Sequence, residues 1–392
     1  MLPRSVKTIQ QLASRQIQTV SIQELLARSA KVTDSAHIQH AQWLREELPV
    51  RLAHRLSDFV ELPYMVVCNA NFHEIFRSLT HAFETLNALP AVTTLAEVNE
   101  FAALLEKHVD AHSDMIQTLQ EGYSELRALL DGIDLDIFLD QTFTTRIGNR
   151  VLAEHFLAVN RARAKILASG EGEIGSMKAG IIDPHCRPAD LVRELAGSLG
   201  DLCADIYGVN PGISLEGQVD TEFSFVPEHL GFVLQEVLKN ALRATAEEHV
   251  YASSVPPVSV EIMKGSFDVT VKVSDLGGGM QPDTIAKIWR YGYTTTMEER
   301  SEPPVTMEGG VLLPGRGGLT GESLDVKRMA GYGFGLPLSR VYARYFGGDI
   351  YVQTMFGHGT DVYINCNHLG DAQESETEAL PASSARGTWT LT

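Results

Sequence analysis

The 392-residue sequence contains no apolar run approaching the roughly 20 residues that a membrane-spanning helix needs. Its four cysteines show no CxxC or other spacing typical of metal ligands, so we expect reduced, buried thiols rather than a zinc site or a disulfide framework. Positive charge is also scarce: 32 Lys and Arg stand against 50 Asp and Glu, a net charge of −18, which argues against nucleic acid as the main partner. A 44% hydrophobic chain of this length predicts a globular protein with two domains of ordinary size.

Acidic residues are missing from one region of this acidic chain. Residues 1–23 contain Arg4, Lys7 and Arg15 but no Asp before position 34 and no Glu before position 24. This bias resembles a mitochondrial transit segment or its remnant. An ordinary polar N-terminal arm is an equal alternative, and in either case we place the segment at residues 1–24. At the other end, the polar, acidic residues 371–392 predict a disordered tail.

The first half of the sequence reads as helical. Apolar residues recur at steps of three and four from Val98 to Leu130, which predicts one long amphipathic helix. Asp131-Gly132 would separate it from a second long helix. The predicted helices are 38–59, 72–86, 98–130 and 135–167. Short connections between them favour a bundle of about four helices over residues 25–170.

The pattern changes after the Gly- and Ser-rich break at 169–180. Val269, Val271 and Val273 alternate with polar residues, as in a strand with one buried face. The predicted strands are 258–263, 268–274, 349–354 and 360–365, with helices at 190–207 and 229–248. We therefore expect an α+β protein, in which an α/β sandwich over 178–370 follows the helical bundle.

The first motif lies on the helix predicted at 229–248. Glu236 and Asn240 are one turn apart and face the same side, and Lys239 and Arg243 lie close by. An Asn amide oxygen suits Mg²⁺, and a carboxylate one turn away could polarise a hydroxyl group. On its own, this string more often marks an ordinary amphipathic helix.

The second motif ends the strand predicted at 268–274. Asp275 could accept a hydrogen bond from the exocyclic amine of adenine, and Gly277 and Gly279 would let the backbone turn tightly beside a nucleotide. A plain β-turn is the commoner meaning of such a string.

Two further glycine motifs follow. Residues 331–336 (GYGFGL) come after a long loop and open a helix, where backbone N–H groups bind phosphate well. The turn at 357–360 (GHGT) places Thr360 where its hydroxyl would face Asp275. A hairpin turn alone would explain the second of these strings.

The four motifs in this order resemble the N-box and three glycine boxes of the GHKL superfamily, which includes histidine kinases and gyrases. The resemblance implies an ATP site of the Bergerat type between residues 228 and 365, with 297–330 as the lid.

The helical half of the sequence narrows the resemblance to one family within this superfamily. The chain is similar, from about residue 48 to 368, to the mitochondrial protein kinases that phosphorylate α-ketoacid dehydrogenases, of the branched-chain and pyruvate types. The matching residues are 48–55, 62–63, 68–69, 138–146 and Arg150 in the helical half, and 239–245 and 333–337 in the second half.

This resemblance implies a protein-serine kinase. Carried over, Glu236 is the base that activates the substrate serine, Asn240 binds Mg²⁺ and Asp275 reads adenine. The other nucleotide contacts implied are Arg243, Gly277, Gly279, Thr294, Thr295, Gly331, Tyr332, Gly333, Phe334, Gly335, Leu336 and Thr360. A bound K⁺, held partly by backbone carbonyls near Tyr293 and Gly333, is a further family feature.

The resemblance also implies partners and a location. The substrate would be the dehydrogenase component of a pyruvate or branched-chain α-ketoacid dehydrogenase complex, which phosphorylation inactivates. A homodimer, docking to a lipoyl domain of the acyltransferase core, and the mitochondrial matrix are expected. His112, Arg146 and Arg150 match an allosteric pocket for small carboxylates, although a core His and a salt-bridged Arg pair would explain them equally well.

Some residues depart from the family pattern. Pyruvate dehydrogenase kinases carry a His one turn before the base, where this chain has Phe232. Residues 288–293 differ from the family, which places the K⁺ site in question, and the lid and the tail differ too.

Three other functions stay open at this point. A two-component histidine kinase would need an exposed phosphoacceptor His, for which His155 is the one tempting residue, although its apolar neighbours favour the core. A non-kinase GHKL ATPase would need a further transducer domain. A silent protein that only docks on a lipoyl-bearing core would not need Glu236 and Asn240.

Overall fold

The computed structural model describes residues 4–30, 33–129, 134–169, 180–294 and 333–375, which form two compact units. The first unit consists of Met1–Gln18, Ile38–Asn149 and Glu376–Thr392, and the second of Thr19–His37 and Arg150–Ser375, as far as these are described. Helices α3 (Asp34–Val60) and α8 (Asp136–Ser169) contribute residues to both. The predicted domain bounds, 25–170 and 178–370, stay predictions.

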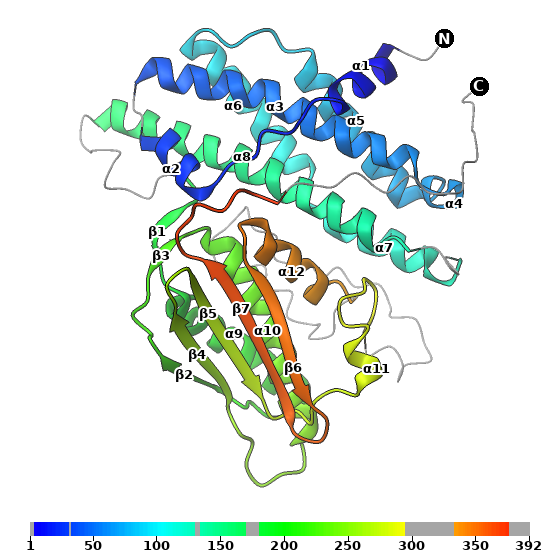
Figure 1. Cartoon of the computed structure of the whole chain (residues 1–392), viewed down its shortest axis with the longest axis vertical. Helices are drawn as coiled ribbons and strands as arrows, with labels where there is room; N and C mark the ends of the chain where they lie inside the picture. The colour runs from blue at the N-terminus through cyan, green and yellow to red at the C-terminus, as the bar shows by residue number, and fades with distance from the viewer. Residues whose placement is uncertain (1–3, 31–32, 130–133, 170–179, 295–332, 376–392) are drawn as a thin grey trace. The chain divides into compact units, whose positions relative to one another are not determined.

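The described part of the first unit is helical (Figure 1). Besides the parts of α3 and α8, it contains α1 (Arg4–Ala13), α4 (Tyr64–Val67), α5 (Ala70–Asn87), α6 (Leu95–Ala111), α7 (Met115–Leu126) and the short 3₁₀ helix η1 (Arg127–Leu129). Phe59 and Phe138 meet edge to face in its core, with ring centroids 5.0 Å apart. Helices α3, α5 and α8 confirm the helices predicted at 38–59, 72–86 and 135–167.

The single helix predicted over residues 98–130 is wrong. The chain leaves the helix at His112 and starts α7 at Met115, so two helices replace one. Ser and Asp compete with helical hydrogen bonds through their own side chains, and Ser113 Oγ donates to Asp114 Oδ1 at 3.1 Å in this break. Apolar positions stay in phase across it, because Leu105 and Ile116 are both buried, so the periodicity did not reveal the break.

The second unit contains a five-stranded sheet in the order β2-β4-β5-β7-β6, in which only the β2–β4 pair is parallel. The strands are β2 (Ile213–Gly217), β4 (Val258–Lys264), β5 (Asp268–Asp275), β6 (Asp349–Met355) and β7 (Gly359–Asn367). Strands β1 (Asp183–Cys186) and β3 (Phe223–Phe225) form a separate antiparallel pair. The four strands predicted from the sequence are present, and β1, β2 and β3 were missed because each is short.

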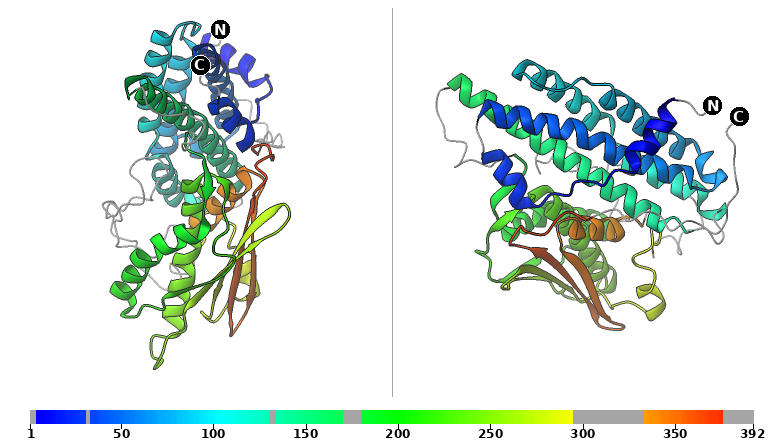
Figure 2. Two further views of the ribbon diagram at one scale, coloured as in Figure 1. Left: turned by 90° about the vertical axis from the view of Figure 1, so that its left-hand side faces the viewer. Right: turned by 45° about the horizontal axis from the view of Figure 1, so that its top comes forward.

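Three helices cover one face of the larger sheet, and the layers separate clearly in the side view (Figure 2). They are α9 (Pro188–Tyr207), α10 (Pro227–Glu248) and α12 (Gly335–Tyr345). On β5, the three alternating valines are buried under these helices, and the residues between them are half-exposed. The predicted α+β fold, with a helical region followed by an α/β sandwich, is confirmed.

Segments from both ends of the second unit lie side by side. Val20 and Glu374 exchange backbone and side-chain hydrogen bonds, and Ser21 bridges to Gln373, next to helix α2 (Ile22–Ala30). Glu374 is only 4% exposed. The expected disorder from Asp371 onward is therefore wrong up to Ser375, because backbone pairing and burial hold that segment, and residues 376–392 lie outside the described part.

Two expectations from composition can be compared with the described residues. No helix among them is long and apolar enough to cross a membrane. All four cysteines are free, but Cys68 is exposed, which differs from the expectation that every thiol would be buried.

Candidate functional site

Helix α10 presents the first motif to a cavity of about 610 Å³. Pro227 begins the helix, a position where its fixed backbone angle is favourable and its missing N–H costs nothing. Val233 and Leu238 are buried, so the opposite side of the helix faces the cavity. Glu236, Asn240 and Arg243 all line it, as their spacing predicted.

Glu236 lines this cavity next to the start of α12. Its residue is 9% exposed, and its Oε1 pairs with Lys239 Nζ at 2.6 Å. A Cβ added at Gly335 would stand 2.2 Å from Glu236 Oε2, so only glycine lets the start of α12 approach the carboxylate this closely. The carboxylate is therefore fixed between a cation on its own helix and the first residue of another helix.

Asp275 ends β5 at the other side of the cavity. Its Oδ1 accepts hydrogen bonds from the backbone N–H groups of Gly277, at 2.9 Å, and Thr360, at 3.2 Å. Burial raises the pKa of Asp275 to about 6, against the lowering effect of these two hydrogen bonds. The hydroxyl of Thr360, which we expected to face Asp275, forms a 3.1 Å hydrogen bond with Thr354 Oγ1.

The glycines after Asp275 make a tight turn against the β6–β7 hairpin. Gly279 has a φ of 65°, in the left-handed region, and a Cβ there would lie 2.1 Å from the carbonyl oxygen of Met355. The predicted need for glycine at this position is therefore explained by the backbone itself.

The third motif is only partly described. Gly333, Gly335 and Leu336 line the cavity at the start of α12. The Phe334 side chain is instead buried, with its ring centroid 4.9 Å from that of Tyr291, so only its backbone is available to a nucleotide. Thr295, Gly331, Tyr332 and the predicted lid at 297–330 lie outside the described residues.

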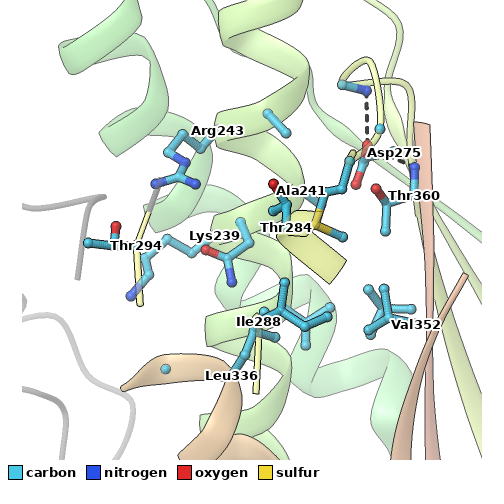
Figure 3. A pocket seen from close by; sticks show the side chains of 18 of the residues that line it. Lys239, Ala241, Arg243, Asp275, Thr284, Ile288, Thr294, Leu336, Val352 and Thr360 are labelled. Carbon is cyan, nitrogen blue, oxygen red and sulfur yellow. Dashed lines mark hydrogen bonds between the residues drawn. The ribbon is translucent and has the colours of Figure 1, made fainter. Parts of the chain in front are cut away.

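The cavity has two chemically different ends (Figure 3). Lys239, Arg243 and Thr294 gather at one end, and Asp275 and Thr360 lie at the other. Phosphates suit the cationic end, and a base amine suits Asp275.

Several residues that line the cavity between these ends were not predicted. Ile288, Val352 and Val362 give it apolar walls, and Met280, Gln281, Thr284, Phe356, Glu247 and Glu248 also line it. Val352 is an apolar strand residue that is not fully buried, which only the folded structure shows.

The residues present fit a Mg²⁺ ion that is bound together with a nucleotide. Asn240 brings a neutral oxygen donor to the cavity one turn from Glu236, and Mg²⁺ commonly combines one or two protein oxygens with phosphate and water. Within the described ranges, no group of three or more His, Cys, Asp or Glu could hold a metal alone. The donor set therefore suits a metal that arrives with the phosphates.

The three residues predicted to bind a carboxylate are divided between the units. His112 and Arg146 belong to the first, where Arg146 Nη2 donates to the Ser113 carbonyl oxygen at 3.4 Å. Arg150 belongs to the second, where it pairs with Glu154.

His155 lies in the core, as its neighbours suggested. It is fully buried, Ser29 Oγ and its Nε2 form a 2.5 Å hydrogen bond, and burial lowers its pKa to about 4. An exposed phosphoacceptor, which a histidine kinase of the two-component type needs, is not provided by this residue.

Comparisons with known proteins agree with this geometry. Residues 19–183 match the family described as mitochondrial branched-chain alpha-ketoacid dehydrogenase kinase, and residues 225–368 match the histidine kinase-, DNA gyrase B- and HSP90-like ATPase family.

Full-length relatives give the same assignment. The chain is 30% identical to the mitochondrial [pyruvate dehydrogenase (acetyl-transferring)] kinase of Arabidopsis thaliana over 91% of this chain and 92% of that protein. It is 30% identical to the Drosophila melanogaster enzyme of that name (86% and 79% covered) and 31% identical to a probable one from Caenorhabditis elegans (89% and 82%). The chain therefore belongs to the mitochondrial α-ketoacid dehydrogenase kinase family, the ATP-dependent protein kinases of the GHKL superfamily.

Proposed function

We propose that this chain transfers the γ-phosphate of ATP to a serine of the dehydrogenase component of a mitochondrial α-ketoacid dehydrogenase complex and thereby inactivates that component. The observation that carries the proposal is the common cavity, into which Glu236 and Asn240 project from one helix and which Asp275 closes at the far end. Phosphoryl transfer depends mainly on positioning and on neutralisation of charge. One cavity here combines the Glu236 carboxylate, the Asn240 amide and an Asp275 carboxylate that can accept from the base.

Each residue has a defined task in this reaction. Asp275 accepts from the adenine amine, and the backbone N–H groups at the start of α12 face the phosphates. Asn240 would hold Mg²⁺, which would neutralise charge on the phosphates when bound. Glu236 takes the proton of the serine hydroxyl as the serine oxygen bonds to the γ-phosphorus, and the bond from that phosphorus to the β–γ bridging oxygen breaks so that ADP leaves.

A K⁺ site near Tyr293 and Gly333 is part of this proposal. A Cβ on Gly333 would lie 2.5 Å from the Tyr293 carbonyl oxygen, and the Gly333 carbonyl accepts from Gly292 N–H at 3.1 Å. Two backbone carbonyl groups thus lie near the cationic end of the cavity, where a monovalent cation would help to hold the phosphates.

The proposal extends to partners, location and regulation. We expect a homodimer in the mitochondrial matrix that docks on a lipoyl domain of the acyltransferase core. Regulation by a small carboxylate stays a prediction. The substrate is one of two, because the relatives are named pyruvate dehydrogenase kinases while the matched helical family is named for the branched-chain enzyme.

The test is transfer of radiolabelled γ-phosphate from ATP to each purified dehydrogenase component. Glu236→Gln should lower the rate about 100-fold or more, as expected for loss of a general base, and leave the affinity for ATP within about twofold because the nucleotide contacts remain. Glu228→Gln, an exposed glutamate at the start of the same helix, is the matched control and should be fully active. Full activity of Glu236→Gln would remove Glu236 as the base, and failure to label either component would refute the substrate class.

A further inference from the structure

A tyrosine on α9 contacts the functional face of α10. Arg243 lines the cationic end of the cavity, and Glu247 follows it by one turn on the same helix. Arg243 Nε and Glu247 Oε1 are 4.0 Å apart, which is an ion pair but longer than a hydrogen bond. Tyr207, the last residue of α9, donates its hydroxyl to the same Oε1 atom at 2.9 Å.

Tyr207 is held as a donor by its surroundings. Burial, and then the hydrogen bond to Glu247, raise the pKa of Tyr207, so the phenol keeps its proton at any physiological pH. Cys203, one turn earlier on α9, is also neutral, because burial and the Glu247 charge raise its pKa to about 11. Within this cluster, Arg243 is the cation that faces the carboxylate.

Glu247 is the more exposed member of this ion pair. Its side chain is 48% exposed and that of Arg243 is 16% exposed, so the carboxylate can turn without leaving water. A glutamate one turn after an arginine is within reach of a direct, charge-assisted hydrogen bond to it, although the reverse order of the two charges is the more favourable one in a helix. Such closure would draw the guanidinium one turn along α10 toward Glu247 and away from Lys239 and the cationic end of the cavity.

We infer that Tyr207 is a positioning residue for the nucleotide: by binding the Glu247 carboxylate from α9, it keeps Arg243 directed at the phosphates. The inference rests on the proposed role of Arg243 in binding ATP. It adds a residue from a helix that contains none of the nucleotide motifs.

The test measures affinities for ATP and adenosine by titration, without a protein substrate. Tyr207→Phe should weaken ATP binding about fivefold, the range expected when a partly exposed ion pair competes with a ligand. Adenosine, which has no phosphate, should bind unchanged. Tyr251→Phe removes a phenol hydroxyl from a residue that is 99% exposed and serves as the matched control.

A double-mutant cycle separates positioning from general support of the fold. Tyr207→Phe should have less than a twofold effect on ATP binding when Glu247→Gln or Arg243→Ala is already present, because no closed ion pair can then form. Glu216→Gln, an exposed glutamate on β2, gives a background in which the fivefold effect should persist.

Three results would overturn the inference: an unchanged affinity in Tyr207→Phe, an equal loss for adenosine, or an equal loss in every background. The second and third would assign Tyr207 to the packing of α9 on α10. Absence of phosphate transfer by the wild-type protein would refute the proposed kinase reaction, and these binding results would still decide the role of Tyr207.

Discussion

Asp275 is more easily protonated in the folded protein than in the unfolded chain. Its folded-state pKa of about 6 lies above the ordinary value of 3.8 for an aspartate, so this carboxyl group favours folding below pH 3.8, and that contribution is lost as the pH rises through 6. The difference of about two pKa units means that, at neutral pH, burial of the charged Asp275 costs roughly 3 kcal/mol of folding stability relative to low pH. A nucleotide amine that donates to Asp275 would offset this cost, which is a reason for the residue to be functional.

Asp275→Asn should therefore stabilise the protein and weaken ATP binding. The amide oxygen can still accept from Gly277 and Thr360, so the free energy of unfolding should rise by up to about 3 kcal/mol at pH 8 and by almost nothing at pH 3.5. The new N–H₂ group would face the adenine amine, so ATP should bind about tenfold or more weakly, as for loss of a charged hydrogen bond. Urea unfolding at both pH values and ATP titration test this.

A nucleotide control makes the assignment specific to the base. ITP carries a carbonyl oxygen in place of the amine, so it should lose less affinity than ATP in Asp275→Asn. Equal losses for the two nucleotides, or reduced stability at pH 8, would contradict the base-reading role.

At this scale the sequence predicted which residues meet but not how they are paired. Glu236 and Asn240 are four residues apart on one helix and therefore share a face of it, so their presence in one cavity followed from the spacing alone. The Lys239 pairing of Glu236 and the Thr354 pairing of Thr360 depend on rotamers that neighbouring elements select. The contact between Tyr207 and Glu247 needs the packing of α9 on α10, which no local pattern encodes.

Helix α12 begins where Glu236 needs space. Gly335→Ala would add a Cβ 2.2 Å from Glu236 Oε2, so the carboxylate or the helix must move. We expect kcat for phosphate transfer to fall about tenfold or more, because small misplacements of a catalytic group are costly. Steady-state kinetics with saturating ATP measure this effect.

Gly231 on α10 supplies the control for a glycine substitution. A Cβ there would meet nothing within 4 Å, so Gly231→Ala should keep full activity and stabilise the helix by roughly 0.5–1 kcal/mol. If Gly335→Ala were as active as Gly231→Ala, the close approach of α12 to the carboxylate would be irrelevant to catalysis.

The elements themselves were predictable where a pattern was long. Strands β4 and β5 and helices α9 and α10 carry several turns or alternations, and their positions follow from period. Strand β3 has three residues, and the gap between α6 and α7 preserves the apolar phase, so neither leaves a periodic signal.

At the scale of the whole molecule, the second unit depends on residues from distant parts of the chain. Glu374 accepts from the Val20 backbone N–H at 3.1 Å, 354 positions away, and from the Tyr345 hydroxyl at the end of α12. The sequence did not predict this pairing, because it joins positions 354 apart and neither short segment carries a strand-length pattern.

Glu374→Ala should lower the free energy of unfolding by about 1–3 kcal/mol, because two buried donors would lose their acceptor. Asp371→Ala, at an exposed position in the same segment, should change it by less than about 0.5 kcal/mol. Urea unfolding followed by circular dichroism distinguishes them. Equal stability of the two variants would show that the pairing of the distant segments contributes nothing.

The pairing of Val20 with Glu374 has a consequence for anyone who shortens the gene. The unit that holds the ATP cavity is not one continuous stretch of sequence, since it includes residues from before α3 and after β7. An expressed fragment that starts at 178 and stops at 370 would omit both halves of this pairing. A tag or fusion partner is therefore better attached beyond these segments than in place of them.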